Sequence, residues 1–595
     1  MLSPHRLSEK AFTALASGYG DPGVVMQLRE VQHSKHLMLL LALTRDCDGI
    51  GLPTRDIAAF RAAYDLLASV QATGSDAVSW LFTLPHVGGW AHDCLARLDQ
   101  GLPPDLGYVP AMAAAAAVRA GLAFELDVPA SEGRVPLPGL GWLHGLELHG
   151  ADQEWITLRS DGERLTAGAR IGVPGRALVP DDGSAGPVPH WQGTPEVRAT
   201  AGGRTWTVLL ETADRHLDRY GLPMAAGLPA GDVANWRRVI QSAWEVVVRD
   251  HEWAAGPLAA GTSVIVPLTA RSEAGLDSAT TLTAFGAIAA TWCADPVIMA
   301  EILVHEFQHL KLCGLLDIVP LTRQSGGALY APWREDPRPA TGLLQGVYAH
   351  LGVARFWNAQ RHVETEPEAI LRAEVLFAHW RGTIAPTINT LLQAGCLTPT
   401  GVRLAGLLLE QGQRLESEAV SAGAREIARE VALNHRLTWQ FRHTALDPAE
   451  VTALAAAYRR GEPSAGHALP EGRVEADTRQ VDSTTRSRLL DMQYLQPGRF
   501  GRLGTAGWPG LSEGDSLLIS GEPDKAVDAY REEIRGAPGP LPGAWTGLAL
   551  ALQLQPCSPL QQAFSARLPL IFDVHACLSG QGMRNDPLEL AAWFT

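Results

Sequence analysis

Lysine is almost absent from this chain. Of its 49 basic residues only four are lysines, while acidic residues number 64, which gives a net charge of −15. Charged residues make up 19% of the sequence, below the roughly 25% usual for soluble domains. A protein that binds nucleic acid in general needs a basic patch to neutralise phosphates. The composition therefore argues against a nucleic-acid-binding role.

Long apolar runs and paired cysteines are also missing. A membrane-spanning helix needs about 20 consecutive apolar residues, and no segment approaches that length. The seven cysteines are dispersed, and none belongs to a CxxC pair. The first residues, MLSPHRLSEKAF, lack the charged and then apolar pattern of a secretory signal. We therefore expect a cytoplasmic protein with free thiols and no membrane role.

Glycine and proline are abundant instead, with 60 and 40 of the 595 residues. A chain of this length is expected to form about three to five structural units. Apolar residues recur at helical spacing in most of it, but strand-like runs between turn-rich clusters occupy one region. The pattern predicts an α+β protein that is predominantly helical. Its expected parts are an N-terminal helical region, a strand-rich region, a mainly helical core, a helical continuation and a C-terminal helical region, at residues 1–125, 126–230, 231–395, 396–465 and 466–595.

The C-terminal region contains two predicted helices, Gly514–Ile534 and Ala544–Leu554. A single repeat unit cannot bury its own apolar face, so an ordinary helical hairpin is the alternative to a tetratricopeptide (TPR-like) repeat. Four residues lie roughly where such a repeat would place them: Gly521, Ala526, Tyr530 and Pro538.

A metal-binding motif occurs in the segment ADPVIMAEILVHEFQHLKLC. Asp295 is a good N-cap residue, and Pro296 suits the first turn of a helix. His305, Glu306 and His309 then form an HExxH motif. Histidines four residues apart lie on one face of a helix, so both imidazoles can reach one divalent metal. Two histidines satisfied by ordinary hydrogen bonds are the alternative, but the rarity of the motif by chance favours a metal site.

A third ligand must come from elsewhere, because the extension HExxHxxGxxH is absent. We predict His350. It lies in a helix with the sequence LLQGVYAHLGVARFW, whose apolar face is expected to be buried, and a metal would explain a polar residue there. A lone histidine in such a place is usually a hydrogen-bonded core residue. Other candidates therefore stay open: Asp317, Glu335, Asp336, His362, Glu364 and Glu374.

An unusual loop, YAPWREDPRP, lies between these two helices. Its three prolines restrict the backbone, so the loop is expected to hold Arg334 and Arg338 in a nearly fixed arrangement. An arginine fork binds a carboxylate through two parallel hydrogen bonds. The loop is therefore suited to the carboxylate of a co-substrate or of a peptide C-terminus. The alternative is that both arginines pair with neighbouring acids, such as Glu335 and Asp336.

These segments resemble a known family. HEFQH, YAPWREDPRP, LLQGVYAHLGVARFW and the N-terminal FTALASGYGD are similar to the HEXXH-motif proteins of bacterial gene clusters for ribosomally synthesised and modified peptides (RiPPs). Such proteins occur alone or fused to radical-SAM cyclophane synthases, and are described as 2-oxoglutarate/HExxH-type peptide β-hydroxylases. The similarity is most specific over Asp295–Asn358 and weakest after about residue 460.

The resemblance implies a function. The substrate would be a ribosomal precursor peptide, a radical-SAM enzyme of the same pathway would be a partner, and residues 231–395 would form the catalytic core. Fe(II) would be the metal and 2-oxoglutarate the co-substrate. The implied residues are His305, His309 and His350 as iron ligands, Arg334 or Arg338 on a 2-oxoglutarate carboxylate, and Glu306 as the catalytic residue, with its role open between ligand, base and bystander.

Two other functions stay open. HExxH is also the motif of zinc metallopeptidases, in which His305 and His309 would bind zinc and Glu306 would activate water. The chain could instead bind a precursor peptide without catalysis. The loop arginines favour the hydroxylase over the peptidase, because a peptidase requires the glutamate but no fixed clamp for a dicarboxylate.

Overall fold

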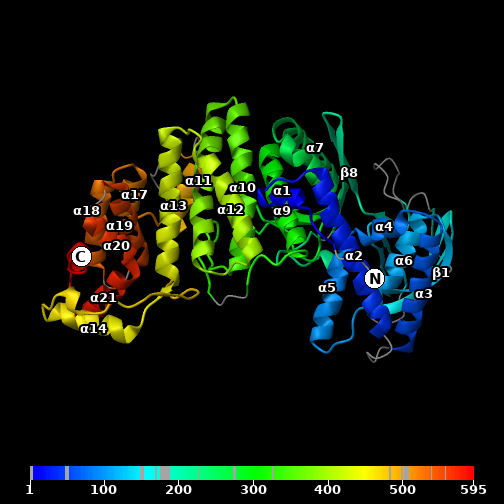
Figure 1. Cartoon of the computed structure of the whole chain (residues 1–595), viewed down its shortest axis with the longest axis horizontal. Helices are drawn as coiled ribbons and strands as arrows, with labels where there is room; N and C mark the ends of the chain where they lie inside the picture. Colours follow the sequence, from blue (N-terminus) through cyan, green and yellow to red (C-terminus); the bar gives the residue numbers. More distant parts are fainter. Residues whose placement is uncertain are drawn as a thin grey trace. The chain divides into compact units, whose positions relative to one another are not determined.

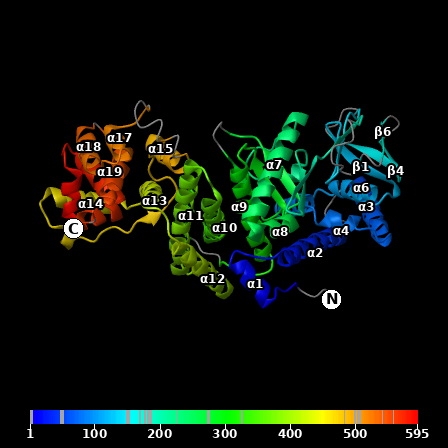
Figure 2. The same ribbon diagram turned by 90° about the horizontal axis from the view of Figure 1, so that it is seen from above.

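The computed structural model covers the whole chain, and Figures 1 and 2 show it in two views. The residues that it describes are 5–46, 53–147, 153–167, 171–174, 178, 188–225, 227–271, 276–323, 327–481, 484–496, 500, 508, 510–537, 539, 541–556 and 558–595.

Helices predominate in the described parts of the chain, and several β-sheets accompany them. The expected α+β, predominantly helical class is therefore confirmed. The chain divides into two compact units, Met1–Pro320 and Leu321–Thr595. This division falls inside residues 231–395, which the sequence indicates as one core, and the five-part division stays a prediction.

The first unit begins with helices around an alanine-rich core. α6 is buried over almost its whole length, because its run of alanines lets α3, α4, β1 and β2 approach closely. The helices of this region are α1 (Glu9–Ala16), α2 (Pro22–Asp46), α3 (Thr54–Ala72), α4 (Ala77–Phe82), α5 (Pro85–Asp99) and α6 (Tyr108–Arg119).

Strands follow, as the alternating sequence pattern predicts. β1, β4, β5 and β6 form one antiparallel sheet in that order, and β2, β3 and β7 form another. In β1, Leu126, Val128 and Ala130 are buried and the residues between them are less so, since successive side chains point to opposite faces. The bounds are β1 (Ala123–Ser131), β2 (Val135–Leu137), β3 (Gly141–Leu143), β4 (Gln153–Asp161), β5 (Arg164–Ala167), β6 (Ile171–Pro174) and β7 (Trp191–Gly193).

A mixed sheet supports the helix that carries HExxH. Its order is β11-β12-β10-β9-β8, with β10 parallel to both β9 and β12 and with antiparallel strands at the two edges. That helix, α9 (Pro296–Leu316), packs against α2, α7 and α8 and against β11 and β12 (Figure 2). The other bounds are β8 (Glu196–Ala201), β9 (Arg204–Leu210), α7 (Ala230–Asp250), α8 (Glu252–Gly261), β10 (Val264–Leu268), β11 (Ser278–Ala279) and β12 (Ala287–Thr291).

The N-terminal segment FTALASGYGD contacts α9 directly. Lys311 Nζ, which is buried, donates to the carbonyl oxygens of Gly18 at 2.9 Å and Tyr19 at 3.0 Å. Gln308 Nε2 donates to the same Gly18 oxygen at 3.2 Å. Gly18 has a φ of 75°, a left-handed conformation that glycine adopts without strain, so the chain turns there between α1 and α2. Two of the segments that carry the family resemblance therefore meet within the first unit.

The second unit starts with long helices. α10 packs against α11 and α12, and α11 also packs against α12 and α13. A short antiparallel pair, β13 (Thr444–Ala445) with β14 (Arg473–Val474), follows α13. The helices are α10 (Ala340–Val363), α11 (Pro367–Gln393), α12 (Pro399–Glu416), α13 (Ala422–His443) and α14 (Pro448–Arg459).

The C-terminal part differs from prediction in one respect, because the helix predicted over Gly514–Ile534 is two helices. The chain turns at Gly521, whose φ of 78° is left-handed, and Pro523 opens the next helix. The helices here are α15 (Thr484–Leu495), α17 (Glu513–Ile519), α18 (Pro523–Gly536), α19 (Pro542–Leu554), α20 (Pro559–Ala566), α21 (Leu568–Gly580) and α22 (Pro587–Trp593).

Tyr530 is the packing centre of this helical group. A Cβ atom added at Gly514 or Gly547 would lie 2.5 or 2.4 Å from its ring, so both glycines are needed for the close approach. Its hydroxyl donates to Asp515 at 2.5 Å. The remaining repeat-like position, Pro538, lies outside the described residues, and the TPR-like assignment stays a prediction.

In the parts of the chain that the structure describes, no helix is long and apolar enough to cross a membrane. The described cysteines are free thiols: Cys94, Cys293, Cys313, Cys396 and Cys577.

Candidate metal centre

The HExxH residues lie on the accessible stripe of an otherwise buried helix. Asp295 caps α9 as predicted, since its carboxylate accepts the N–H groups of Val297 and Ile298, and Pro296 opens the first turn. From Met299 to Leu315 nearly every residue is buried. Only positions 301, 305 and 309 remain partly exposed, and these are one helical turn apart on the same face. The core therefore holds the helix and leaves both histidines accessible.

The two imidazoles converge on one point. Nε2 of His305 lies 3.2 Å from Nε2 of His309, with the ring planes 78° apart. Two nitrogen ligands at about 2.1 Å from one metal, and about 90–110° apart, are about 3.0–3.4 Å from each other. The observed separation fits this geometry, so the pair can supply two of the ligands of a metal ion.

Glu306 points inward from the same turn. Its side chain is buried, and Oε1 accepts a hydrogen bond from the Ser278 hydroxyl at 2.7 Å while lying 3.9 Å from Nε2 of His305. Burial raises the pKa of Glu306, although His309 and the Ser278 hydroxyl oppose this. Oε2 has no hydrogen-bond partner among the described residues. A buried carboxylate is thus positioned beside the imidazole pair, with the hydroxyls of Ser278 and Thr280 next to it.

Tyr220 is a neighbour of this site that sequence reasoning missed. It lies after β9, its hydroxyl is buried, and that hydroxyl has no hydrogen-bond partner among the described residues. Burial raises the pKa of Tyr220, and the charge of Glu306 adds to this. The sequence gives no signal for this tyrosine, because no motif surrounds it. Only the fold brings its segment near the motif-bearing helix.

In the second unit, His350 is buried and firmly oriented. Its Nδ1 lies 2.8 Å from the carbonyl oxygen of Gly346 and must donate, because a carbonyl only accepts. In a neutral imidazole the lone pair then belongs to Nε2, the nitrogen that can coordinate a metal. A backbone carbonyl on the other ring nitrogen is the usual way in which proteins orient a histidine ligand. Its ring lies between two indoles, with centroids 4.5 Å from Trp333 and 4.3 Å from Trp380.

The two loop arginines bind Asp336. Arg334 Nε donates to its Oδ1 at 2.7 Å, and Arg338 Nη1 donates to its Oδ2 at 3.1 Å. Burial favours a higher pKa of Asp336, but the hydrogen bonds from both arginines outweigh it and lower the pKa below its ordinary value. This is the local pairing that the sequence leaves as an alternative to a carboxylate clamp. The Arg334 side chain is 52% exposed, so its other N–H groups remain accessible.

The loop is also fastened to α13. The Tyr330 hydroxyl and His435 Nδ1 form a hydrogen bond of 3.0 Å. His443 Nε2 donates to the carbonyl oxygen of Glu335 at 2.6 Å. The prolines thus cooperate with a histidine-bearing helix in fixing the loop.

The other candidate ligands are less suited to metal binding than His350, because they are exposed or already have a side-chain partner. His362 is exposed near the end of α10. Each acidic candidate already has a side-chain partner: Asp317 with Lys35, Glu335 with Arg442, Asp336 with Arg334, Glu364 with Gln360 and Glu374 with Ser421.

Each unit therefore contains part of the predicted set. The first brings together His305, Glu306 and His309, and the second contains His350 and the arginine loop. Within the described residues, no three His, Cys, Asp or Glu side chains already form a complete metal site. In comparisons with known proteins, no family model matches the chain and no curated protein is significantly similar to it.

Proposed function

We propose that this chain is an Fe(II)- and 2-oxoglutarate-dependent peptide hydroxylase that installs a β-hydroxyl group on a residue of a ribosomally made precursor peptide. The observation that carries the proposal is the imidazole pair of His305 and His309, 3.2 Å apart on the accessible stripe of a buried helix. Imidazole binds iron and zinc alike, so the choice of iron rests on the family resemblance.

Each residue has a separate task. His305 and His309 hold the metal, with His350 as the predicted third ligand. When bound, Fe(II) and 2-oxoglutarate supply the oxidative chemistry that converts a C–H bond into C–OH. Arg334 or Arg338 binds a carboxylate of 2-oxoglutarate, which requires that arginine to exchange Asp336 for the co-substrate.

Glu306 supports a second candidate function, a zinc metallopeptidase. Its carboxylate is buried 3.9 Å from His305 Nε2, and burial raises its pKa. A general base for a metal-bound water needs both proximity and a pKa above that of an ordinary carboxylate. In the hydroxylase, the role of Glu306 stays open between ligand, base and bystander.

One reconstitution separates these functions. The apoprotein is loaded anaerobically with Fe(II) and then given 2-oxoglutarate, oxygen and a short precursor peptide encoded beside its gene. We expect stoichiometric succinate and a peptide heavier by one oxygen atom, and neither product from His305→Ala. Peptide cleavage by the zinc-loaded protein without succinate would establish the peptidase instead. Peptide binding without either product would establish a non-catalytic role.

A further inference from the structure

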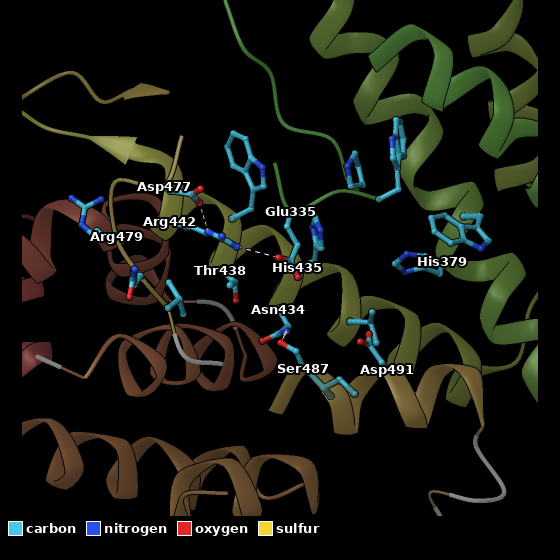
Figure 3. Close-up of a pocket in the computed structure, with 18 residues that line it drawn as sticks. Glu335, His379, Asn434, His435, Thr438, Arg442, Asp477, Arg479, Ser487 and Asp491 are labelled. Carbon is cyan, nitrogen blue, oxygen red and sulfur yellow. Dashed lines mark hydrogen bonds and ion pairs between the residues drawn. The ribbon is translucent and has the colours of Figure 1, made fainter. Parts of the chain in front are cut away.

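The second unit contains a cavity of about 780 Å³ to which the proposed reaction assigns no task (Figure 3). Residues of the loop YAPWREDPRP, α11, α13, α15 and the segment 477–481 line it. Its volume is within the range of small-ligand sites in proteins. Figure 3 shows Glu335 of the loop, Asn434 and His435 of α13, and Asp491 of α15 around it.

Three indoles form the aromatic part of the wall: Trp333, Trp380 and Trp439. Trp333 lies so close to α10 that a Cβ atom at Gly346 would be 2.2 Å from its ring. Trp439 packs edge-on against Tyr330, with centroids 5.0 Å apart. The indoles are therefore held in place by the protein before any ligand enters, which lowers the entropic cost of binding.

Both cationic side chains in the wall are already paired with acids. Arg442 donates to Asp477 at 2.6 Å and to Glu335 at 3.1 Å. Arg479 donates to Asp573 at 3.1 Å. Neither guanidinium is therefore available to balance a further negative charge in the cavity.

Asp491 is the acid in the wall that lacks such a partner. Among the described residues, no Lys, Arg or His lies within ion-pair distance of its carboxylate. Asp491 lies on an exposed part of the wall. Partial burial of its carboxylate and the charge of Glu335 raise the pKa of Asp491 to about 6.

The histidines do not supply the missing positive charge. Burial lowers the pKa of His379 to about 4, and burial also lowers the pKa of His435, whose Nδ1 lies 3.0 Å from the Tyr330 hydroxyl. At neutral pH the cavity thus combines indole rings with a carboxylate that has no countercharge among the described residues. This combination attracts cations, because a ring face carries negative potential and the negative charge of Asp491 adds to it.

We infer that this cavity binds an organic cation, the ammonium or guanidinium group of a basic peptide side chain or of a free amine, with Asp491 as its counterion and the tryptophans as its walls. Cation binding requires neither iron nor 2-oxoglutarate, so its test is independent of the hydroxylase test.

Isothermal titration of the full-length apoprotein at neutral pH tests this inference. The probes are N-acetyl-lysine amide, N-acetyl-arginine amide and butylammonium, with N-acetyl-norleucine amide as the neutral analogue and glutarate as the anion. We expect at least one cation to bind and both the neutral and anionic probes to bind at least about tenfold more weakly. Tighter binding of the capped amino acids than of butylammonium identifies a peptide side chain as the source, and the reverse order identifies a free amine.

Two variants locate the site. Asp491→Asn is expected to weaken cation binding about tenfold, because it removes the countercharge and keeps the shape. Trp439→Leu is expected to weaken it about three- to tenfold, and Trp439→Phe less, because phenylalanine retains a ring face. Asp524→Asn, the same change at an exposed acid on α18 outside the cavity, is the matched control. Equal binding of lysine and norleucine amides, preferred binding of glutarate, or unchanged affinity in a folded Asp491→Asn protein would overturn the inference.

Discussion

At the scale of single residues, the proposed chemistry depends on which nitrogen of each imidazole carries a proton. The carbonyl of Gly346 fixes the proton of His350 on Nδ1 and leaves the Nε2 lone pair for coordination. His305 and His309 instead face each other through their Nε2 atoms. A metal would replace this close contact with two coordinate bonds.

The third ligand can be assigned by comparing two histidines on one helix. His350→Gln is expected to lose stoichiometric Fe(II), with affinity reduced at least about tenfold, because loss of a ligand or its support usually costs that much. His362→Gln, on the exposed end of α10, is the matched control and should keep its iron. The measurement is iron content after anaerobic dialysis, with circular dichroism to show that both variants are folded. The opposite result would reassign the ligand to His362, and full retention by both would point to one of the acids.

The proposed binding of 2-oxoglutarate by the loop arginines can be tested by changing Asp336, the carboxylate with which they now pair. Asp336→Asn weakens the pairing with Arg334 and Arg338, so the apparent KM for 2-oxoglutarate is expected to fall. Replacing both arginines by alanine should raise that KM about tenfold or more, since a charged hydrogen bond contributes about 1.5–3 kcal/mol. Succinate formation against co-substrate concentration measures both. An unchanged KM in the double variant would remove the clamp from the mechanism.

A buried ion pair elsewhere in the first unit makes stability depend on pH. His86 Nε2 lies 3.0 Å from Glu211 Oε2, and both side chains are almost fully buried. Burial favours a lower pKa of His86, but the hydrogen bond to Glu211 and the charges of Asp214 and Glu211 together outweigh it and raise the pKa above 6.5. Burial likewise favours a higher pKa of Glu211, but His86 lowers it below 4.5. The contribution of His86 to the free energy of unfolding is therefore complete below pH 6.5 and is lost as the pH rises through its folded pKa. The contribution of Glu211 is complete above pH 4.5 and is lost as the pH falls through its folded pKa.

The pair thus stabilises the fold most between pH 4.5 and 6.5. Glu211→Gln is expected to lower the free energy of unfolding by about 3–5 kcal/mol at pH 5.5, because a buried charge loses its partner. The loss should shrink toward about 1–2 kcal/mol at alkaline pH above the folded pKa of His86, where this imidazole is neutral in both proteins. Urea titrations at the two pH values measure it, and Glu252→Gln, which changes an exposed pair with Arg204, is the control. A loss that is equal at both pH values would contradict the assignment.

At the scale of elements, local sequence signals were enough to predict where α9 begins. They were not enough to predict the contacts that residues make with other elements. Asp295 and Pro296 act within one turn of the chain, and the structure has both in their expected roles. The break at Gly521 also had a local signal, a glycine two residues before a proline, but the helical periodicity on either side obscured it. Trp333 is different, because its packing on Gly346 joins a loop to a helix and leaves no periodic trace.

The anchoring of α9 to the turn after α1 yields a prediction at this scale. Lys311→Met keeps the length of the side chain but removes the buried donor to the carbonyl oxygens of Gly18 and Tyr19, so stability should fall by about 1–3 kcal/mol. Lys35→Met is the matched control: Lys35 pairs with Asp317, the residue that follows α9, but it is 37% exposed, and the expected cost is below about 1 kcal/mol. Urea denaturation of both variants measures the difference. Equal losses would show that the buried lysine does not anchor the helix.

At the scale of the whole molecule, the division after Pro320 assigns the imidazole pair and the proposed cation-binding cavity to different units. The imidazole pair belongs to the first unit, and every residue that lines the cation cavity belongs to the second, between 332 and 491. The second unit also has a polar centre of its own. Arg486, 1% exposed, donates to Asp515 at 2.8 Å, to Asn434 at 3.1 Å and to Thr546 at 2.7 Å.

These internal contacts predict that a fragment spanning residues 321–595 folds without the first unit. It is expected to melt in one cooperative, helical transition by circular dichroism and to bind the same organic cation as the full chain, with affinity within about threefold. Arg486→Met in the fragment should lower its melting temperature strongly, because the Asp515 carboxylate, only 14% exposed, would lose its countercharge. Arg535→Met, an exposed arginine on α18 paired with Glu532, is the control and should change it little. A fragment that is unfolded, or folded but unable to bind a cation that the full chain binds, would show that the second unit depends on residues before 321.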